Sequence, residues 1–126
     1  MRDFRELKVW EKSHLLALTV YRTTATLPKE ELYGLTSQIR RACTSIPANI
    51  AEGTGRGSDA EMVRFLHIAL GSASELDYHL LLARDLHFLN NGVYEQLSSE
   101  LAEVKRMLNA FIQKLKANGV RLKAKS

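Results

Sequence analysis

Cysteine, proline and glycine are all scarce in this chain of 126 residues. Cys43 is the single cysteine, which excludes an intrachain disulfide and a zinc site built from several cysteines. Only two prolines and seven glycines interrupt the chain, which favours long regular elements. No stretch free of Asp, Glu, Lys and Arg exceeds ten residues, whereas a membrane-spanning helix needs about 20 apolar residues. The sequence therefore predicts a protein that does not span a membrane.

The length and the start of the chain indicate one domain in the cytoplasm. A chain of 126 residues with 45% apolar content is large enough for one core and too short for two. The first eight residues, MRDFRELK, alternate charged and apolar side chains and do not resemble a secretory signal. We therefore expect a cytoplasmic location.

Positive charge is concentrated at the C-terminal end. The net charge is +4, yet residues 105–126 hold seven Lys or Arg and no acid, which leaves residues 1–104 with eleven positive and fourteen negative side chains. Such a segment attracts phosphate backbones through charge alone. The alternative is a solvated helix end whose cations offset the helix dipole and keep the protein soluble.

Apolar residues recur at three- and four-residue steps along most of the chain, as in helices with one buried face. The stripe of the first helix consists of Leu7, Trp10, His14, Ala17 and Tyr21. We expect helices over 4–26, from 29 to about 53, from Ser58 to the Asn90-Asn91-Gly92 sequence, and around 97–115 with an end at Gly119. Short connections predict an all-α, antiparallel up-down-up-down four-helix bundle over residues 1–119, followed by a basic, frayed tail over 120–126.

Pro47 lies inside the second expected helix. Ile50 keeps helical phase with Ile39 and Ile46, which predicts that the helix continues through the proline. Proline removes a backbone donor and costs about 3 kcal/mol in a straight helix. We therefore expect a kink at Pro47 that re-aims residues 49–53.

The third helix carries apolar side chains on more than one face. Five of them fall outside its main stripe, namely Val63, Ile68, Leu70, Leu81 and Leu82. Apolar surface around most of a helix predicts contact with a second subunit. The alternative is a tight bundle core with a few leucines on the surface.

No arrangement of catalytic or metal-binding residues stands out. A di-iron bundle uses two Glu-x-x-His motifs, whereas this chain has one, Glu11 to His14. The glycine-rich 53–57 stretch follows a helix instead of a strand and lacks the Lys-Ser/Thr pair of a phosphate loop. We expect no enzymatic activity, no metal and no cofactor. Glu75 lies next to core residue Leu76, and if its carboxylate is buried we expect Arg41 to be its cation.

Three stretches, LKVWEKSHLLALTVYRTT, LPKEELYGLTSQIRRACTSIPANIAEG and FLHIALGSASELDYHLLLARDL, resemble the bacterial four-helix bundle family that includes proteins encoded in intervening sequences of 23S ribosomal RNA genes. The shared motif includes Gln38, Arg41, Ser45, Pro47, Asn49, Glu52, Gly53, Gly71, Ser72 and Glu75. The resemblance implies a ring, typically a homopentamer, without known enzymatic activity. A similar bundle, the accessory variability determinant of diversity-generating retroelements, is a basic ring that binds nucleic acid and a reverse transcriptase.

The motif has two interpretations. Its proline, small residues and hydrogen-bonding side chains suit tight packing between subunits, whereas RNA recognition usually adds exposed aromatic side chains for stacking. Packing is the interpretation we favour. The candidate nucleic-acid-binding residues are Arg40, Arg41, Arg56, Lys105, Arg106, Lys114, Lys116, Arg121, Lys123 and Lys125. The sequence thus predicts an RNA-associated homo-oligomeric scaffold, with a protein-interaction module that binds no nucleic acid as the alternative.

Overall fold

A computed structural model describes residues 3–125 of the chain and the side chains of residues 3–119. Four α-helices and two short 3-10 helices follow one another as η1 (Phe4–Glu6), α1 (Lys8–Thr24), η2 (Lys29–Glu31), α2 (Leu35–Gly55), α3 (Asp59–Asp85) and α4 (Asn91–Lys125). No strand occurs among the described residues. The prediction of an all-α four-helix fold is confirmed.

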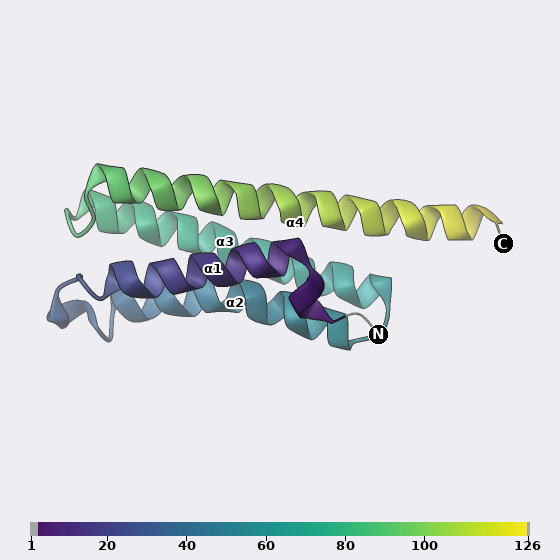
Figure 1. Cartoon of the computed structure of the whole chain (residues 1–126), viewed down its shortest axis with the longest axis horizontal. Coiled ribbons are helices and arrows are strands. Elements are labelled where there is room, and N and C mark those ends of the chain that lie inside the picture. Colours follow the sequence, from purple (N-terminus) through teal and green to yellow (C-terminus); the bar gives the residue numbers. More distant parts are fainter. Residues whose placement is uncertain (1–2, 126) are drawn as a thin grey trace.

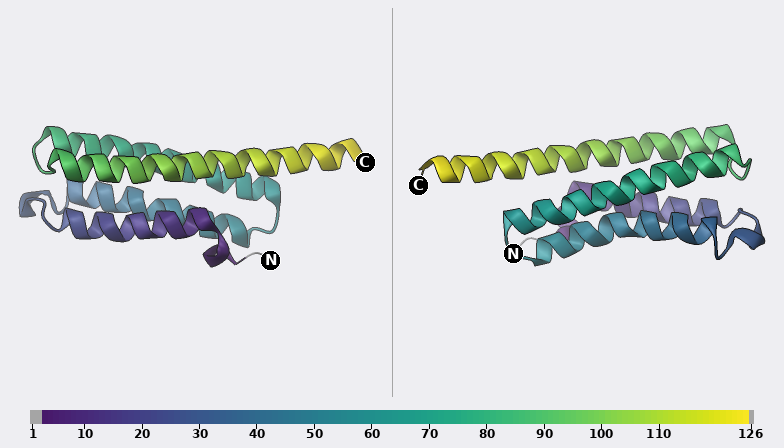
Figure 2. Two further views of the ribbon diagram at one scale, coloured as in Figure 1. Left: turned by 45° about the horizontal axis from the view of Figure 1, so that its top comes forward. Right: turned by 180° about the vertical axis from the view of Figure 1, so that it is seen from behind.

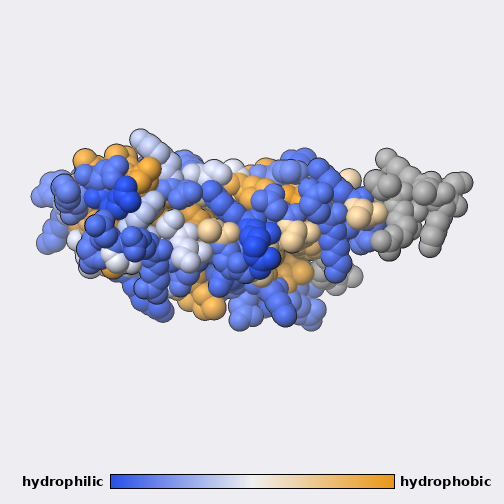
Figure 3. Space-filling model, turned by 90° about the horizontal axis from the view of Figure 1, so that it is seen from above, coloured by the Kyte–Doolittle hydropathy of each residue, from blue (hydrophilic) through white to orange (hydrophobic). Residues whose placement is uncertain are grey.

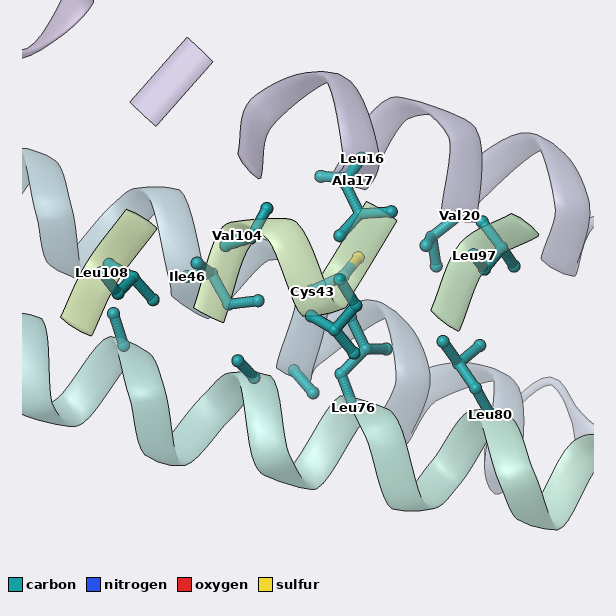
Figure 4. Packing of buried hydrophobic residues seen from close by; sticks show 14 of the residues in the cluster. Leu16, Ala17, Val20, Cys43, Ile46, Leu76, Leu80, Leu97, Val104 and Leu108 are labelled. Atoms are coloured by element: carbon teal, nitrogen blue, oxygen red, sulfur yellow. The ribbon is translucent and has the colours of Figure 1, made fainter. Parts of the chain in front are cut away.

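The four α-helices lie along one long axis, and the ribbon colours run in opposite directions along successive helices (Figure 1). Both α1 and α3 contact α2 and α4, so the helices surround one core in cyclic order. Side chains from all four helices meet in this core, as Leu16, Ile46, Leu76 and Val104 illustrate (Figure 4). Burial of this apolar surface is the main term that stabilises the bundle.

The second α-helix continues through Pro47, as predicted, and the proline ring is buried. Side chains add hydrogen bonds near the missing backbone donor. The Thr44 hydroxyl donates to the Arg40 carbonyl at 2.9 Å, and the Asn49 side-chain amide donates to the Ser45 carbonyl at 2.8 Å. The kink at Pro47 stays a prediction.

Two helix starts differ from the expected ones. The chain is extended at Leu7, with φ −81° and ψ 124°, so α1 begins at Lys8 and Phe4–Glu6 forms a separate 3-10 turn. In the same way η2 is separate from α2, which begins at Leu35. Leu32, which follows η2, is 46% exposed.

The end of α3 and the start of α4 also differ from the prediction. α3 ends at Asp85, where the backbone amide of Phe88 donates to the Ala83 carbonyl at 2.9 Å. His87 occupies the left-handed position of this turn, with φ 65°. The Asn90 side chain accepts a hydrogen bond from the Val93 amide at 2.8 Å, so this asparagine caps the start of α4 instead of ending α3.

The fourth α-helix projects beyond the other three (Figures 1 and 2). Its 35 residues correspond to about 52 Å of helix at 1.5 Å per residue. The end expected at Gly119 is wrong, because α4 runs to Lys125. Fraying of residues 120–126 stays a prediction. Within the described residues, no helix combines the length and apolar character that crossing a membrane requires.

Candidate nucleic-acid interface

Arg40 is engaged within the chain. Its Nε donates to the Thr24 hydroxyl at 3.0 Å and its Nη2 donates to the Tyr21 carbonyl at 3.3 Å. The guanidinium also lies over the Tyr21 ring, 4.7 Å from its centroid. A cation in this place satisfies backbone groups at the end of α1 and complements the helix dipole. Arg40 therefore has a structural role in the bundle.

Arg41 of α2 and Arg56, which follows the last residue of α2, each form an ion pair. Arg41 pairs with Glu75 of α3 at 3.3 Å and donates to the Gln38 side chain at 2.8 Å. The sequence-based pairing of Arg41 with Glu75 is thus present, although the Glu75 side chain is 39% exposed and not buried. Arg56 pairs with Glu52 one turn earlier, at 3.2 Å.

Two cations on α4 are also paired. Lys105 donates to Asp77 of α3 at 3.1 Å, which ties these neighbouring helices together. Arg106 donates to Glu103 at 2.9 Å, and this hydrogen bond lowers the pKa of the Glu103 carboxyl. Both pairs are partly exposed, so each adds little to stability.

The C-terminal part of α4 holds the remaining candidates. Lys114 and Lys116 are exposed, and no acidic side chain among the described residues pairs with either. Arg121, Lys123 and Lys125 lie outside the described side chains. No Asp or Glu follows Glu103 in the sequence. Among the candidates with described side chains, Lys114 and Lys116 are therefore the two without a hydrogen-bond or ionic partner.

Most of the remaining motif residues form a seam between α2 and α3 of the same chain. We define the α2–α3 seam by Gln38, Arg41, Ser45, Asn49 and Gly53 of α2 with Ser72 and Glu75 of α3. The Ser45 and Ser72 hydroxyl oxygens are 2.8 Å apart, and Asn49 Nδ2 donates to the Ser45 hydroxyl at 2.9 Å. The motif thus contributes to contacts within one protomer, which the sequence interpretation did not foresee.

Gly53 permits the close approach of the two helices. A Cβ atom at this position would lie 2.8 Å from Met62 Sδ and 3.0 Å from Phe65 Cβ, both on α3. Contacts below 3.0 Å are essentially absent between real Cβ atoms and their neighbours. A larger residue would therefore require the Met62 side chain to move and Phe65 to give way by a few tenths of an ångström.

Gly71 behaves differently from Gly53. It is exposed, and no atom lies within 4 Å of the Cβ position. Ile68, three residues before it, and Tyr78, seven after it, are 41% and 59% exposed. Spacings of three and seven residues place all three on one face of a helix. The exposed face of α3 thus carries an apolar pair around a glycine that no contact within the chain explains.

Contacts within one chain explain part of the apolar character of α3. Val63, Leu70 and Leu82 are partly buried and pack against the core of the same protomer, whereas Ile68 is exposed. Residues on α1 that the sequence analysis did not single out are also exposed, with Leu15 at 53%. Figure 3 shows hydrophobic residues in separate groups among hydrophilic ones on one face of the molecule.

Reactive side chains are sparse in the part of the chain that the structure describes. No three His, Cys, Asp or Glu side chains lie together as metal ligands would among the described residues. Cys43 is buried in the core, and burial raises the pKa of its thiol to about 12. A neutral, enclosed thiol packs as a small apolar side chain.

The comparison with protein families matches residues 5–110 to the 23S rRNA-intervening sequence protein family. The chain belongs to this family. A crystal structure from Bacteroides thetaiotaomicron VPI-5482, of a protein with unknown function from the S23 ribosomal protein family, aligns with a TM-score of 0.74 and 29% sequence identity. The alignment covers 82% of this chain and 97% of that chain. The comparison with curated proteins finds no match.

The family that the sequence motifs predicted is therefore confirmed, while the similarity to the retroelement accessory protein stays a prediction. The 23S rRNA-intervening sequence protein match ends at residue 110. The cations from Lys114 onward lie beyond it. The family match includes the bundle and the α2–α3 seam. It does not include the cations after residue 110, so any role of these cations has to be argued from the charges of this chain.

Proposed function

We propose that this 23S rRNA-intervening sequence protein is a non-enzymatic, cytoplasmic scaffold that forms a homo-oligomeric ring, a pentamer, and associates with RNA. The observation that carries the proposal is the projection of α4 beyond the bundle (Figure 1). Every charged side chain after Glu103 is a cation, so the C-terminal part of α4 carries no acidic side chain. Phosphate backbones bind such surfaces without sequence readout.

A ring strengthens this attraction. One projection makes few phosphate contacts, but several projections held in one assembly bind the same RNA with a much higher effective concentration. Binding would then be strong at low salt and would weaken steeply as salt rises, because each neutralised phosphate releases counterions.

The exposed face of α3 supports the oligomeric part of the proposal. Glycine inside a helix costs about 1 kcal/mol relative to alanine, and Gly71 has no neighbour within its own chain that requires it. A backbone from another subunit can approach closely at glycine, and the exposed side chains of Ile68 and Tyr78 beside it would be covered by that contact.

An electrophoretic mobility shift with a structured RNA hairpin tests the RNA association. We expect a shift at about 50 mM salt that is lost by about 200 mM. The double variant Lys116→Glu/Lys123→Glu replaces two positive charges near the C-terminal end of α4 with negative ones. We expect it to bind RNA at least about tenfold more weakly than the wild type. Arg22→Glu/Lys29→Glu makes the same change in net charge at exposed positions on the far end of the bundle, and it should bind as the wild type does.

Two results would contradict the proposal. Absence of any shift for the wild type at low salt would remove RNA association. Equal weakening by both double variants would show that net charge, and not the projection of α4, controls binding.

A further inference from the structure

The bundle places α1 and α3 at opposite corners. Each of these helices contacts α2 and α4, and no contact joins α1 to α3 among the residues that the structure describes. The ribbon colours advance in the same direction along both helices (Figure 1), so α1 and α3 run parallel. Their outward faces therefore lie on opposite sides of the molecule.

The outward face of α1 carries an exposed apolar pair. Leu15 and Leu18 are 53% and 39% exposed. Glu11, which is also exposed, lies one turn before Leu15. Spacings of four and seven residues place these three side chains on one face of a helix. We call this surface the α1 face.

The outward face of α3 repeats every seven residues. Arg64, Gly71, Tyr78 and Asp85 are all exposed, and steps of seven keep them near one line along a helix. The Tyr78 side chain is 59% exposed, and no atom lies within 4 Å of a Cβ placed on Gly71. The missing side chain at Gly71 leaves a hole that a side chain of another helix can fill. We call this surface the α3 face.

The two faces lie at the same height along the bundle. Two pairs of core residues on these helices are level with each other along its axis, namely Leu16 with Leu76 and Val20 with Leu80 (Figure 4). Both helices run in the same direction and rise by 1.5 Å per residue, so Leu18 is level with Tyr78. A rotation about an axis parallel to the bundle preserves height, and it brings Leu18 of one copy toward Tyr78 of another.

The charges on the two faces favour the same alignment. Glu11 is level with Gly71 by the same spacing. On the α3 face Arg64 comes seven residues before Gly71, and Asp85 comes fourteen residues after it. Parallel helices therefore place Glu11 nearer the cation, whereas antiparallel helices would place it nearer the acid. Charges at the rim of a contact select its orientation and add little to its affinity.

We propose that the α1 face is the second half of the subunit interface, with Leu15 and Leu18 of one copy packed on Gly71 and Tyr78 of the next. The contact joins two different surfaces, and repeating such a contact by rotation closes a ring. It removes the exposed apolar side chains of both helices from water. The inference rests on the proposed homo-oligomer, whose two contact surfaces it names, and it requires no bound RNA.

Paired cysteines test the inference on the full-length protein. The double variant Leu18→Cys/Tyr78→Cys places one thiol on each face, while Cys43 stays buried in the core. Oxidation with copper phenanthroline should link each copy to the next and give a ladder of covalent oligomers on a denaturing gel, because a disulfide needs Cα atoms within about 7 Å. Leu18→Cys/Ala102→Cys is the matched control, since Ala102 is exposed on α4, and it should give no ladder.

Single variants distinguish a contact between different faces from a contact between identical ones. Coexpressed Leu18→Cys and Tyr78→Cys chains should form a covalent dimer, whereas each variant alone should not. Leu15→Arg should lower the sedimenting mass without loss of helix content in circular dichroism, because it places a charge in the contact. Leu32→Arg, at a leucine of similar exposure outside both faces, should leave the mass unchanged.

Four results would overturn the inference: no ladder from Leu18→Cys/Tyr78→Cys, an equal ladder from its control, a covalent dimer of Tyr78→Cys alone, or no loss of mass for Leu15→Arg beyond that of Leu32→Arg. If the wild type sediments as an oligomer in these cases, the proposed ring stands and other surfaces build it. A wild-type mass of one protomer would remove the ring and the inference together.

Discussion

Ser45 and Ser72 face each other across α2 and α3, with their hydroxyl oxygens 2.8 Å apart. Asn49 donates to the Ser45 hydroxyl from one turn further along α2, so the contact is part of a small network. Gly53 lies toward one end of this seam, and the Arg41–Glu75 pair lies toward the other. The motif that suggested contacts between subunits thus forms, in large part, contacts between two helices of one protomer.

The two glycines of the motif should respond in opposite ways to the same substitution. Gly53→Ala places a Cβ against Met62 and Phe65, and we expect a loss of about 1–3 kcal/mol in the free energy of unfolding from overpacking. Gly71→Ala meets no atom and should stabilise the protomer by up to about 1 kcal/mol through helix propensity. Urea denaturation measures both. Equal effects of the two substitutions would show that the close approach at Gly53 is absent.

The Ser45–Ser72 contact should give a measurable coupling energy. A double-mutant cycle with Ser45→Ala, Ser72→Ala and the double variant isolates the hydrogen bond between them. We expect a coupling of about 0.5–1.5 kcal/mol, the usual net value for a neutral hydrogen bond in a protein. Additive effects of the two substitutions would mean that the hydroxyls do not bond in solution.

Glu75→Gln should change stability only slightly. The Arg41 and Glu75 side chains are 65% and 39% exposed, and pairs in contact with water contribute about 0–1 kcal/mol. We expect thermal unfolding to shift by less than about 3 °C, which corresponds to about 0.8 kcal/mol for a domain of this size. A larger loss would show that the carboxylate is desolvated, for example by a second subunit.

His87 should be replaceable by glycine with a gain in stability. Its φ of 65° lies in the left-handed region, which costs a residue with a Cβ about 1–2 kcal/mol and costs glycine little. We expect His87→Gly to raise the free energy of unfolding by about 1 kcal/mol, while His87→Ala gives no such gain. Destabilisation by His87→Gly would indicate that the imidazole makes a contact that the protein needs.

Helix number, family and the start of α3 could be predicted from the sequence because they rest on local signals. The Ser58 hydroxyl accepts from the Glu61 amide at 3.2 Å, as its capping sequence predicts. The Glu61 side chain, however, pairs with Arg64 instead of returning to the cap. The end of α3 could not be predicted, because a histidine and not a glycine takes the left-handed position.

The buried face of α1 was predicted only in part, since Ala17 of the expected stripe is buried and Trp10 packs against the core. The stripe expected through Trp10 and Tyr21 lies at the edge of the core, and Tyr21 is 42% exposed. Val9, Leu16 and Val20 are buried instead. The expected stripe was built around the large aromatic residues Trp10 and Tyr21. In the structure the Trp10 ring stacks on His14, with 4.9 Å between the ring centroids, and the Tyr21 ring lies under the Arg40 guanidinium. The packing of the four helices determines which residues of α1 are buried, and the sequence of α1 alone does not show it.

The ionic partners of the cations could not be predicted beyond the Arg41–Glu75 pair. Arg40, Lys105 and Arg106 are equivalent to Lys114 in sequence terms, but the bundle brings acids or carbonyl oxygens to the first three. These partners come from other helices for Arg40 and Lys105, so no local pattern reveals them. Of the seven candidate cations whose side chains the structure describes, Lys114 and Lys116 are the ones left without a hydrogen-bond or ionic partner.

Sedimentation velocity at micromolar concentration tests the central claim, a ring of identical chains, most directly. The account predicts a multiple of the 14.2 kDa protomer mass, fivefold for the ring, and a lower mass for Gly71→Arg, which places a long charged side chain on the exposed face of α3. Gly55→Arg, at another open and exposed glycine, should leave the mass unchanged. A wild-type mass of 14.2 kDa would contradict the account.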